Sequence, residues 1–159
     1  MITSLEPLLR EHPVFKGMDD SLIQLIAGCA KNVRYQAGES IARQGEPADE
    51  FFLIREGRMA MEMPAPQGGT VLLQTYREGE VIGWSWLVPP YHWHFDLRAM
   101  TDLRVFSIDG RCLRAKCEED PAFGYNIMER FAHLMAERLE STRLQLMDLY
   151  SGPTGSVPE

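Results

Sequence analysis

The sequence predicts a mainly β fold with flanking helices, in which short antiparallel strands form a roll and one long helix follows. Short apolar runs recur from about residue 32, and glycines bound each of them. Regularly spaced short strands with turn residues between them are typical of antiparallel rolls and barrels. A helical pattern without a breaker then runs from Pro121 to about Tyr150. At 159 residues, 45% of them hydrophobic, the chain has the size and composition of one globular domain.

Two helices are predicted before the roll. Residues 5–10 form a short helical pattern that His12-Pro13 ends. The stretch 18–21, Met-Asp-Asp-Ser, supplies N-cap side chains for a second helix. Apolar residues follow at helical spacing, namely Leu22, Leu25, Ile26 and Cys29.

Seven strands are predicted in the roll, which we place at about residues 32–108. Each of the first five is an apolar run next to glycine, at 33–35, 40–43, 51–54, 59–63 and 71–76. The bounding glycines are Gly38, Gly45, Gly57, Gly68-Gly69 and Gly79. Two more strands are expected at about Trp93–Met100 and Leu103–Ile108.

Two C-terminal helices are predicted over about 109–150, which complete a domain of residues 1–150. Asp109 is a candidate N-cap for a short helix through Cys117, and Asp120-Pro121 is a strong helix start, because a capping acid precedes proline at the first helical position. The tail, 151–159, is polar and rich in proline and glycine. We expect the tail to be disordered.

The long helix carries two apolar stripes. Phe123, Ile127, Phe131 and Leu134 form the first, which suits packing on the roll. The second, called the heptad stripe below, alternates spacings of four and three, as in a coiled coil. A roll of this size covers only part of a helix about 45 Å long, so the heptad stripe predicts a homodimer. The heptad stripe comprises Met128, Ala132, Met135, Leu139, Thr142, Leu146 and Leu149, all except Ala132 being candidate interface residues.

Composition excludes several classes of protein. A net charge of -7 and a pI of about 5.1 argue against nucleic-acid binding, which needs clustered cations. No apolar run is long enough to span a membrane, and the N-terminus lacks the features of a signal peptide, so we expect a cytoplasmic protein.

The three cysteines are expected to be free thiols in a reducing compartment. Their number is odd. Cys112 and Cys117 lie five apart in a predicted helix, about 140° apart around its axis, which is too far for a disulfide or a shared metal.

The most unusual segment holds all three tryptophans and two of the four histidines within residues 83–96. Large aromatic side chains beside Pro89-Pro90 favour a shaped pocket wall. If 92–98 form a strand, Trp93, Phe95 and Leu97 share an apolar face. His92, His94 and Asp96 then share the polar face, where a cupin-like metal site is an alternative. That motif needs a third histidine on a later strand, whereas His12 and His133 fall in or beside predicted helices, so no metal ligand is assigned.

The glycine-punctuated strands resemble the cyclic nucleotide-binding domain of the CRP/FNR regulator family. The residues that carry the resemblance are Gly38-Glu39, the run 45–57, Gly79-Glu80-Val81-Ile82-Gly83 and 98–102, and the match covers about residues 14–150. The resemblance implies a double-stranded β-helix, or jelly-roll-like β-roll, with a long C-terminal dimerisation helix beside the ligand pocket.

The phosphate-binding cassette departs from the family pattern. In nucleotide-binding members it reads Phe-Gly-Glu, followed about a dozen residues later by Arg-Ser/Thr-Ala. Here Gly83 matches the glycine, but Trp84 replaces the glutamate that holds the ribose. The arginine position falls on Trp93 or His94, depending on the direction of counting. Arg98 matches a different family position. Tight binding of cyclic AMP or cyclic GMP is therefore not expected.

Two functions remain from the sequence, and neither is enzymatic, because no nucleophile–base pair is apparent. One is a sensor whose rebuilt pocket takes a small planar or cyclic nucleotide-like ligand. The other is a ligand-free pseudo-receptor that acts as a dimeric interaction module. A genuine cyclic nucleotide binder and a haem sensor are weaker alternatives. No cofactor is assigned. The candidate ligand-binding residues are Gly83, Trp84, Ser85, Trp86, His92, Trp93 and His94.

The output is predicted to pass through a protein partner. Family transcription factors continue after the long helix into a helix-turn-helix domain, whereas this chain has nine residues after Tyr150. We therefore expect no DNA binding.

Overall fold

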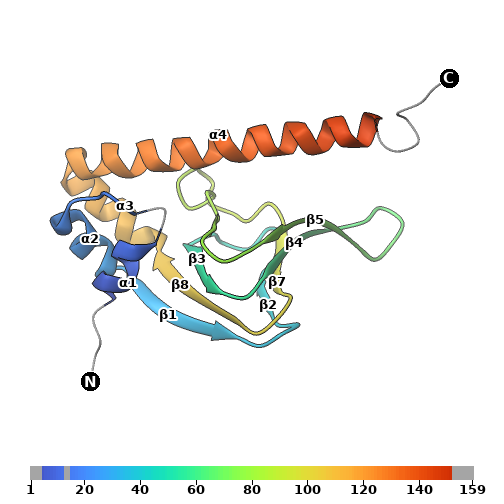
Figure 1. The fold of residues 1–159 in the computed structure, drawn as a ribbon, viewed down its shortest axis with the longest axis horizontal. Coiled ribbons are helices and arrows are strands. Elements are labelled where there is room, and N and C mark those ends of the chain that lie inside the picture. The colour runs from blue at the N-terminus through green and yellow to red at the C-terminus, as the bar shows by residue number, and fades with distance from the viewer. Residues whose placement is uncertain (1–4, 13–14, 152–159) are drawn as a thin grey trace.

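The predicted fold class is confirmed: in the part of the chain that the structure describes, eight strands form two packed antiparallel sheets, with helices at one end and along one side (Figure 1). The computed structural model describes residues 5–12 and 15–151. One sheet has the order β1-β8-β3-β6 and the other β2-β7-β4-β5. The strands are β1 (Ala30–Tyr35), β2 (Ser40–Ala42), β3 (Glu50–Glu56), β4 (Met59–Pro64), β5 (Thr70–Tyr76), β6 (Val81–Ile82), β7 (Asp96–Ala99) and β8 (Leu103–Asp109).

Most predicted strands are confirmed, with two differences. β6 was not predicted as a strand, because two residues are too short for a periodic pattern. The strand expected at Trp93–Met100 begins only at Asp96. Residues before it bond to a loop instead: the Trp93 amide donates to the Glu46 carbonyl and the Trp93 carbonyl accepts from the Gly45 amide, each at 2.9 Å.

Strand β3 is buried on both faces and separates two apolar cores. Phe51 and Leu53 point toward the helices, whereas Phe52 and Ile54 point into the interior of the roll. β3 lies between β8 and β6, so its backbone groups are paired along both edges. Continuous burial of this kind explains why the run Phe-Phe-Leu-Ile lacks the alternation of a half-exposed strand.

The turn between β3 and β4 requires glycine. Gly57 has a φ of +99°, and a Cβ atom there would lie 2.4 Å from the Asp102 carbonyl oxygen. Any other side chain would displace the turn that starts β8.

The described residues include helices that flank the roll, namely α1 (Glu6–Glu11), α2 (Asp20–Ala27), α3 (Gly110–Glu119) and α4 (Pro121–Ser151). The predicted cap of α3 is confirmed, because an Asp109 carboxylate oxygen accepts hydrogen bonds from the Arg111 and Cys112 amides at 2.9 and 3.0 Å. Asp120 caps α4 in the same way, through the amides of Ala122 and Phe123. Asp19 precedes α2, but its side chain makes no capping hydrogen bond.

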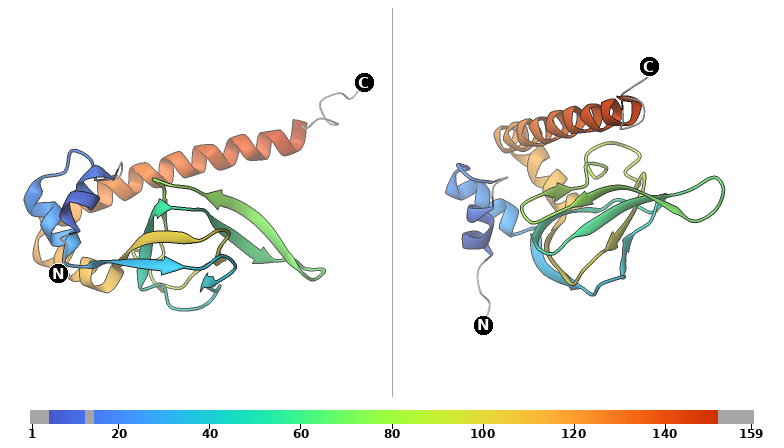
Figure 2. Two further views of the ribbon diagram at one scale, coloured as in Figure 1. Left: turned by 60° about the horizontal axis from the view of Figure 1, so that its bottom comes forward. Right: turned by 45° about the vertical axis from the view of Figure 1, so that its right-hand side comes forward.

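Helix α4 starts at the end of the molecule where the other helices lie and runs along the roll toward the opposite end (Figures 1 and 2). Its buried residues all fall in its first eleven positions: Phe123, Gly124, Ile127 and Phe131. Apolar side chains farther along, such as Leu139 and Leu146, are about half exposed. The distal part of the helix therefore has little cover from its own chain. The tail predicted to be disordered lies outside the described residues from 152 onward.

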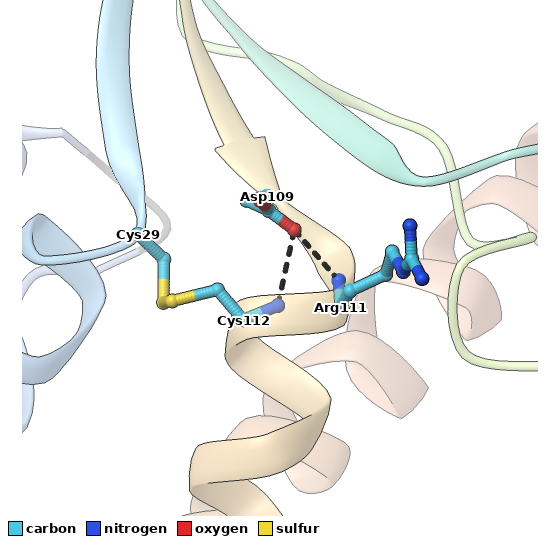
Figure 3. Close-up of a disulfide and its surroundings, with 4 residues drawn as sticks. All are labelled: Cys29, Asp109, Arg111 and Cys112. Carbon is cyan, nitrogen blue, oxygen red and sulfur yellow. Dashed lines mark hydrogen bonds between the residues drawn. A yellow bond between two sulfur atoms is a disulfide. The ribbon is translucent and has the colours of Figure 1, made fainter.

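The expectation that all cysteines are free is wrong for Cys29 and Cys112, which form a disulfide with a Cα–Cα distance of 5.7 Å (Figure 3). The cause is topology. Ala30 at the start of β1 pairs with Ile108 near the end of β8, and α3 begins two residues later. Cys29 therefore lies beside the first turn of α3, although 83 residues separate it from Cys112. Cys117 remains a free thiol.

Replacing Cys112 with serine should lower the free energy of unfolding by about 2–4 kcal/mol without reductant, because the bridge restricts the unfolded chain. Denaturant titration measures this change, and dithiothreitol should abolish the difference from the parent protein. Cys117→Ser is the matched control and should leave stability unchanged under both conditions. Alkylation of the unfolded parent should modify one cysteine before reduction and three after it; three before reduction would contradict the bridge.

Candidate functional site

The tryptophan-rich segment forms the loop that joins β6 to β7. Residues 83–95 contain turns and no regular helix or strand, and His92 makes an isolated β-bridge with Pro47. Burial nevertheless alternates as predicted: Trp93, Phe95 and Leu97 are buried, whereas His92 and His94 are exposed.

Trp86 lies in the core between the roll and the helices. Its side chain is fully buried and stacks on Phe51, with ring centroids 4.8 Å apart. The ring of Phe131, on α4, meets the Trp86 ring edge to face, with ring centroids 5.2 Å apart. The Trp86 carbonyl accepts a hydrogen bond from the Arg114 guanidinium, which also lies 4.2 Å over the Tyr91 ring. The loop is thus held to both α3 and α4.

Trp93 lies on the opposite side of β3, inside the roll. Its ring stacks on Phe52 at 6.1 Å. A Cβ atom at Gly83, where φ is +109°, would lie 3.0 Å from the Trp93 ring and 3.2 Å from the Phe51 Cβ. Glycine at position 83 is therefore needed for close packing of the indole.

Trp84, Ser85 and His94 form a small cluster at the surface of the loop. The rings of Trp84 and His94 stack at 5.0 Å, and the buried Ser85 hydroxyl lies 3.3 Å from His94 Nδ1. His92 is exposed and bridges to Pro47.

A cavity of about 370 Å³ lies between the roll and α4. Gly83 and Trp84 are the two predicted ligand residues in its lining, and Ser85, Trp86, His92, Trp93 and His94 lie outside it. Three of the predicted dimer residues, Met135, Leu139 and Thr142, also line it. The other lining residues come from the strands, the loop and α4: Met61, Tyr76, Val81, Phe95, Phe131, Leu134 and Arg138.

The cavity is mostly apolar and has one charged side chain, Arg138. Its guanidinium lies 4.4 Å over the ring of Tyr76. Burial raises the pKa of the Tyr76 hydroxyl, against the opposing effect of Arg138 and with a further raising effect of Glu80. Sequence reasoning missed Arg138. Its spacing on α4 could have indicated it. Arg138 lies three residues after Met135 and four before Thr142, which places all three on one helical face.

Arg98 forms an ion pair with Glu62 on the sheet that contains β4 and β7. It donates two hydrogen bonds to the carboxylate of the nearly buried Glu62, at 2.6 and 3.2 Å. Within residues 5–12 and 15–151, no group of three histidine, cysteine or acidic side chains is arranged to hold a metal ion. In the same residues, no helix is long and apolar enough to cross a membrane.

Truncation should separate the two kinds of tryptophan in this loop. Trp86→Ala should lower the free energy of unfolding by about 3–5 kcal/mol, because it empties a fully packed site. Trp84→Ala should cost less than about 1 kcal/mol, since its half-buried ring faces the cavity and His94. Denaturant unfolding measures both values, and equal losses would contradict this division.

Comparison with known proteins agrees with the fold. The family model described as "Cyclic nucleotide-binding domain" matches residues 32–120. A "CRP-like cAMP-activated global transcriptional regulator" from Mycobacterium tuberculosis is 25% identical over 145 residues, which are 91% of this chain and 63% of the relative. The chain thus spans less than two thirds of that relative's length.

Solved structures show the same architecture. A putative cyclic nucleotide-binding protein from Geobacter metallireducens is 27% identical and superposes with a TM-score of 0.76, covering 87% of this chain and 99% of that one. The regulatory domain of Toxoplasma gondii PKA, crystallised with cAMP, has a TM-score of 0.65 at 18% identity, covering 86% of this chain and 48% of that one. The loop with the three tryptophans, residues 84–93, lies inside the region matched by the family model. The chain therefore belongs to the cyclic nucleotide-binding domain family.

Proposed function

We propose that this chain is a non-enzymatic, homodimeric sensor domain whose pocket has been rebuilt for a ligand other than cyclic AMP or cyclic GMP. The observation that carries this proposal is the composition of the cavity between the roll and α4. The cavity has room for a small molecule, but its loop side presents Trp84 and Phe95 and no cation.

The absence of a phosphate partner on the loop supports exclusion of the ordinary ligands. At the two candidate arginine positions, Trp93 packs inside the roll and His94 stacks on Trp84. Arg98 is held by Glu62. A charge-assisted hydrogen bond to phosphate is worth about 1.5–3 kcal/mol, so losing a two-bond arginine contact weakens binding by orders of magnitude.

The pseudo-receptor alternative rests on the two tryptophans that fill protein cores. Trp86 and Trp93 act as structural side chains, as that alternative requires. The space beside Trp84, however, is not filled by them, and its lining is predominantly apolar. This open volume favours a sensor.

The cavity and the heptad stripe share Met135, Leu139 and Thr142. These side chains remain exposed because the roll does not cover them. A second copy of α4 packed on the heptad stripe would bury them and close one side of the cavity. Ligand binding and helix pairing would then depend on the same residues, which gives a route from sensor to output.

Cyclic AMP should not bind at physiological concentrations. Titration to about 1 mM, followed by tryptophan fluorescence and calorimetry, should give no saturable signal, because the phosphate has no arginine on the loop. The cAMP-activated mycobacterial relative serves as the positive control. Saturable binding in the micromolar range would overturn the proposal and make this chain an ordinary cyclic nucleotide receptor.

The dimer is tested by two matched lysine substitutions on α4. Leu146 and Leu144 are similarly exposed, at 50% and 55%, but only Leu146 belongs to the heptad stripe. Leu146→Lys should convert the dimer to a monomer, since it places a charge within the pairing surface, whereas Leu144→Lys should leave the dimer intact. Light scattering after size exclusion measures both masses. A monomeric parent protein, or equal effects of the two changes, would contradict the assignment.

A further inference from the structure

We infer that the cavity between the roll and α4 binds an organic acid with an apolar body and one negative charge, oriented by Arg138. This inference rests on the proposed function and specifies the class of ligand. Its basis is the combination of an apolar wall with one cation.

The apolar lining of the cavity favours a ligand whose body is apolar. Met61 and Val81 from the strands, Phe95 from the loop and Leu134 from α4 offer no hydrogen-bonding groups except a thioether sulfur. Trp84 adds a flat aromatic surface. A sugar or a highly hydroxylated ligand would leave several polar groups without partners here, whereas a flat aromatic or an aliphatic body would not.

The positive charge of Arg138 favours a ligand with one negative charge. Arg138 is the one ionisable side chain of the lining besides Tyr76, and no Asp or Glu lines the cavity. Acidic residues do line the neighbouring cavity on the other side of Arg138, namely Glu80, Glu129 and Glu137. Within the described ranges, however, Arg138 forms no ion pair within 4 Å, and its guanidinium lies over the Tyr76 ring.

Desolvation of Arg138 favours an acidic ligand over a neutral one. A neutral apolar ligand would remove water from the Arg138 guanidinium. The charge would then keep only its contact with the Tyr76 ring, which does not offset the free energy lost with its hydration. An acid group would replace that water with a charge-assisted hydrogen bond. The other polar groups support an acceptor at this end. The Tyr76 hydroxyl has only a weak partner, Met61 Sδ at 3.7 Å, so it remains available as a second donor. The Thr142 hydroxyl already donates to the Arg138 carbonyl.

The test uses two fluorescent probes with almost the same aromatic body. 8-Anilinonaphthalene-1-sulfonate carries one negative charge, and N-phenyl-1-naphthylamine is neutral. We expect the parent protein to bind the anionic probe more tightly. Arg138→Gln should weaken binding of the anionic probe about tenfold or more and change binding of the neutral probe less than about twofold. Arg143→Gln is the matched control, because Arg143 lies outside the cavity and pairs with Glu140 at 3.9 Å.

A second variant locates the probes. Met61→Trp fills the cavity from β4 and should abolish binding of both probes, with circular dichroism as the check on folding. Anionic-probe binding that survives Met61→Trp would place the probe elsewhere and overturn the inference. Equal binding of the two probes, unaffected by Arg138→Gln, would also overturn it while leaving a ligand-binding sensor in place. If the parent bound neither probe, the rebuilt pocket would fail together with the inference.

Discussion

Strand β3 is the constraint on which the rest of the molecule depends, because its two faces belong to two different cores. Adjacent residues on a strand point in opposite directions, so Phe51 and Phe52 each present a ring to one core. Each ring stacks on a tryptophan from the same loop, Trp86 on Phe51 and Trp93 on Phe52. The loop therefore passes around the edge of β3, next to β6, and is fixed on both sides. Gly83 lies at the crossing point, where no room remains for a side chain.

This arrangement limits what the loop can contribute to binding. Residues that fill a core cannot also rearrange around a ligand without a large loss of packing. Trp86 and Trp93 are held in this way, and Phe131 ties Trp86 to α4. Of the three tryptophans, Trp84 alone faces the cavity, where it meets side chains of α4 rather than a phosphate cradle. Under the proposed function, the binding surface therefore lies more on the helix than on the loop, and its charge comes from Arg138.

Much of the fold followed from local sequence signals, and the misses have physical causes. Glycine turns fixed the strands, and Asp109 and Asp120 marked the helix starts, because caps and turns are set by neighbouring residues. The Cys29–Cys112 bridge depends on the pairing of β1 with β8, which no local pattern contains. The tryptophans marked this segment as unusual but gave no division between core and cavity, since both environments favour indole rings. Arg138 was missed because a charged residue on a long helix usually faces solvent.

Under the proposed function, helix α4 connects ligand binding to output. Its first turns are anchored by buried aromatic side chains, whereas its later turns expose Leu139, Thr142 and Leu146. A ligand can shift a helix-pairing equilibrium only by the difference between its affinities for the two states. A ligand enclosed at the anchored end alone would contact the same groups in both states and shift nothing. Met135, Leu139 and Thr142 line the cavity, and pairing of two α4 helices would bury them, so ligand contacts with these side chains would differ between the paired and unpaired states. Under the proposed function, regulation therefore arises where the cavity and the heptad stripe overlap. Ligand contacts with the rest of the cavity contribute to affinity but not to regulation.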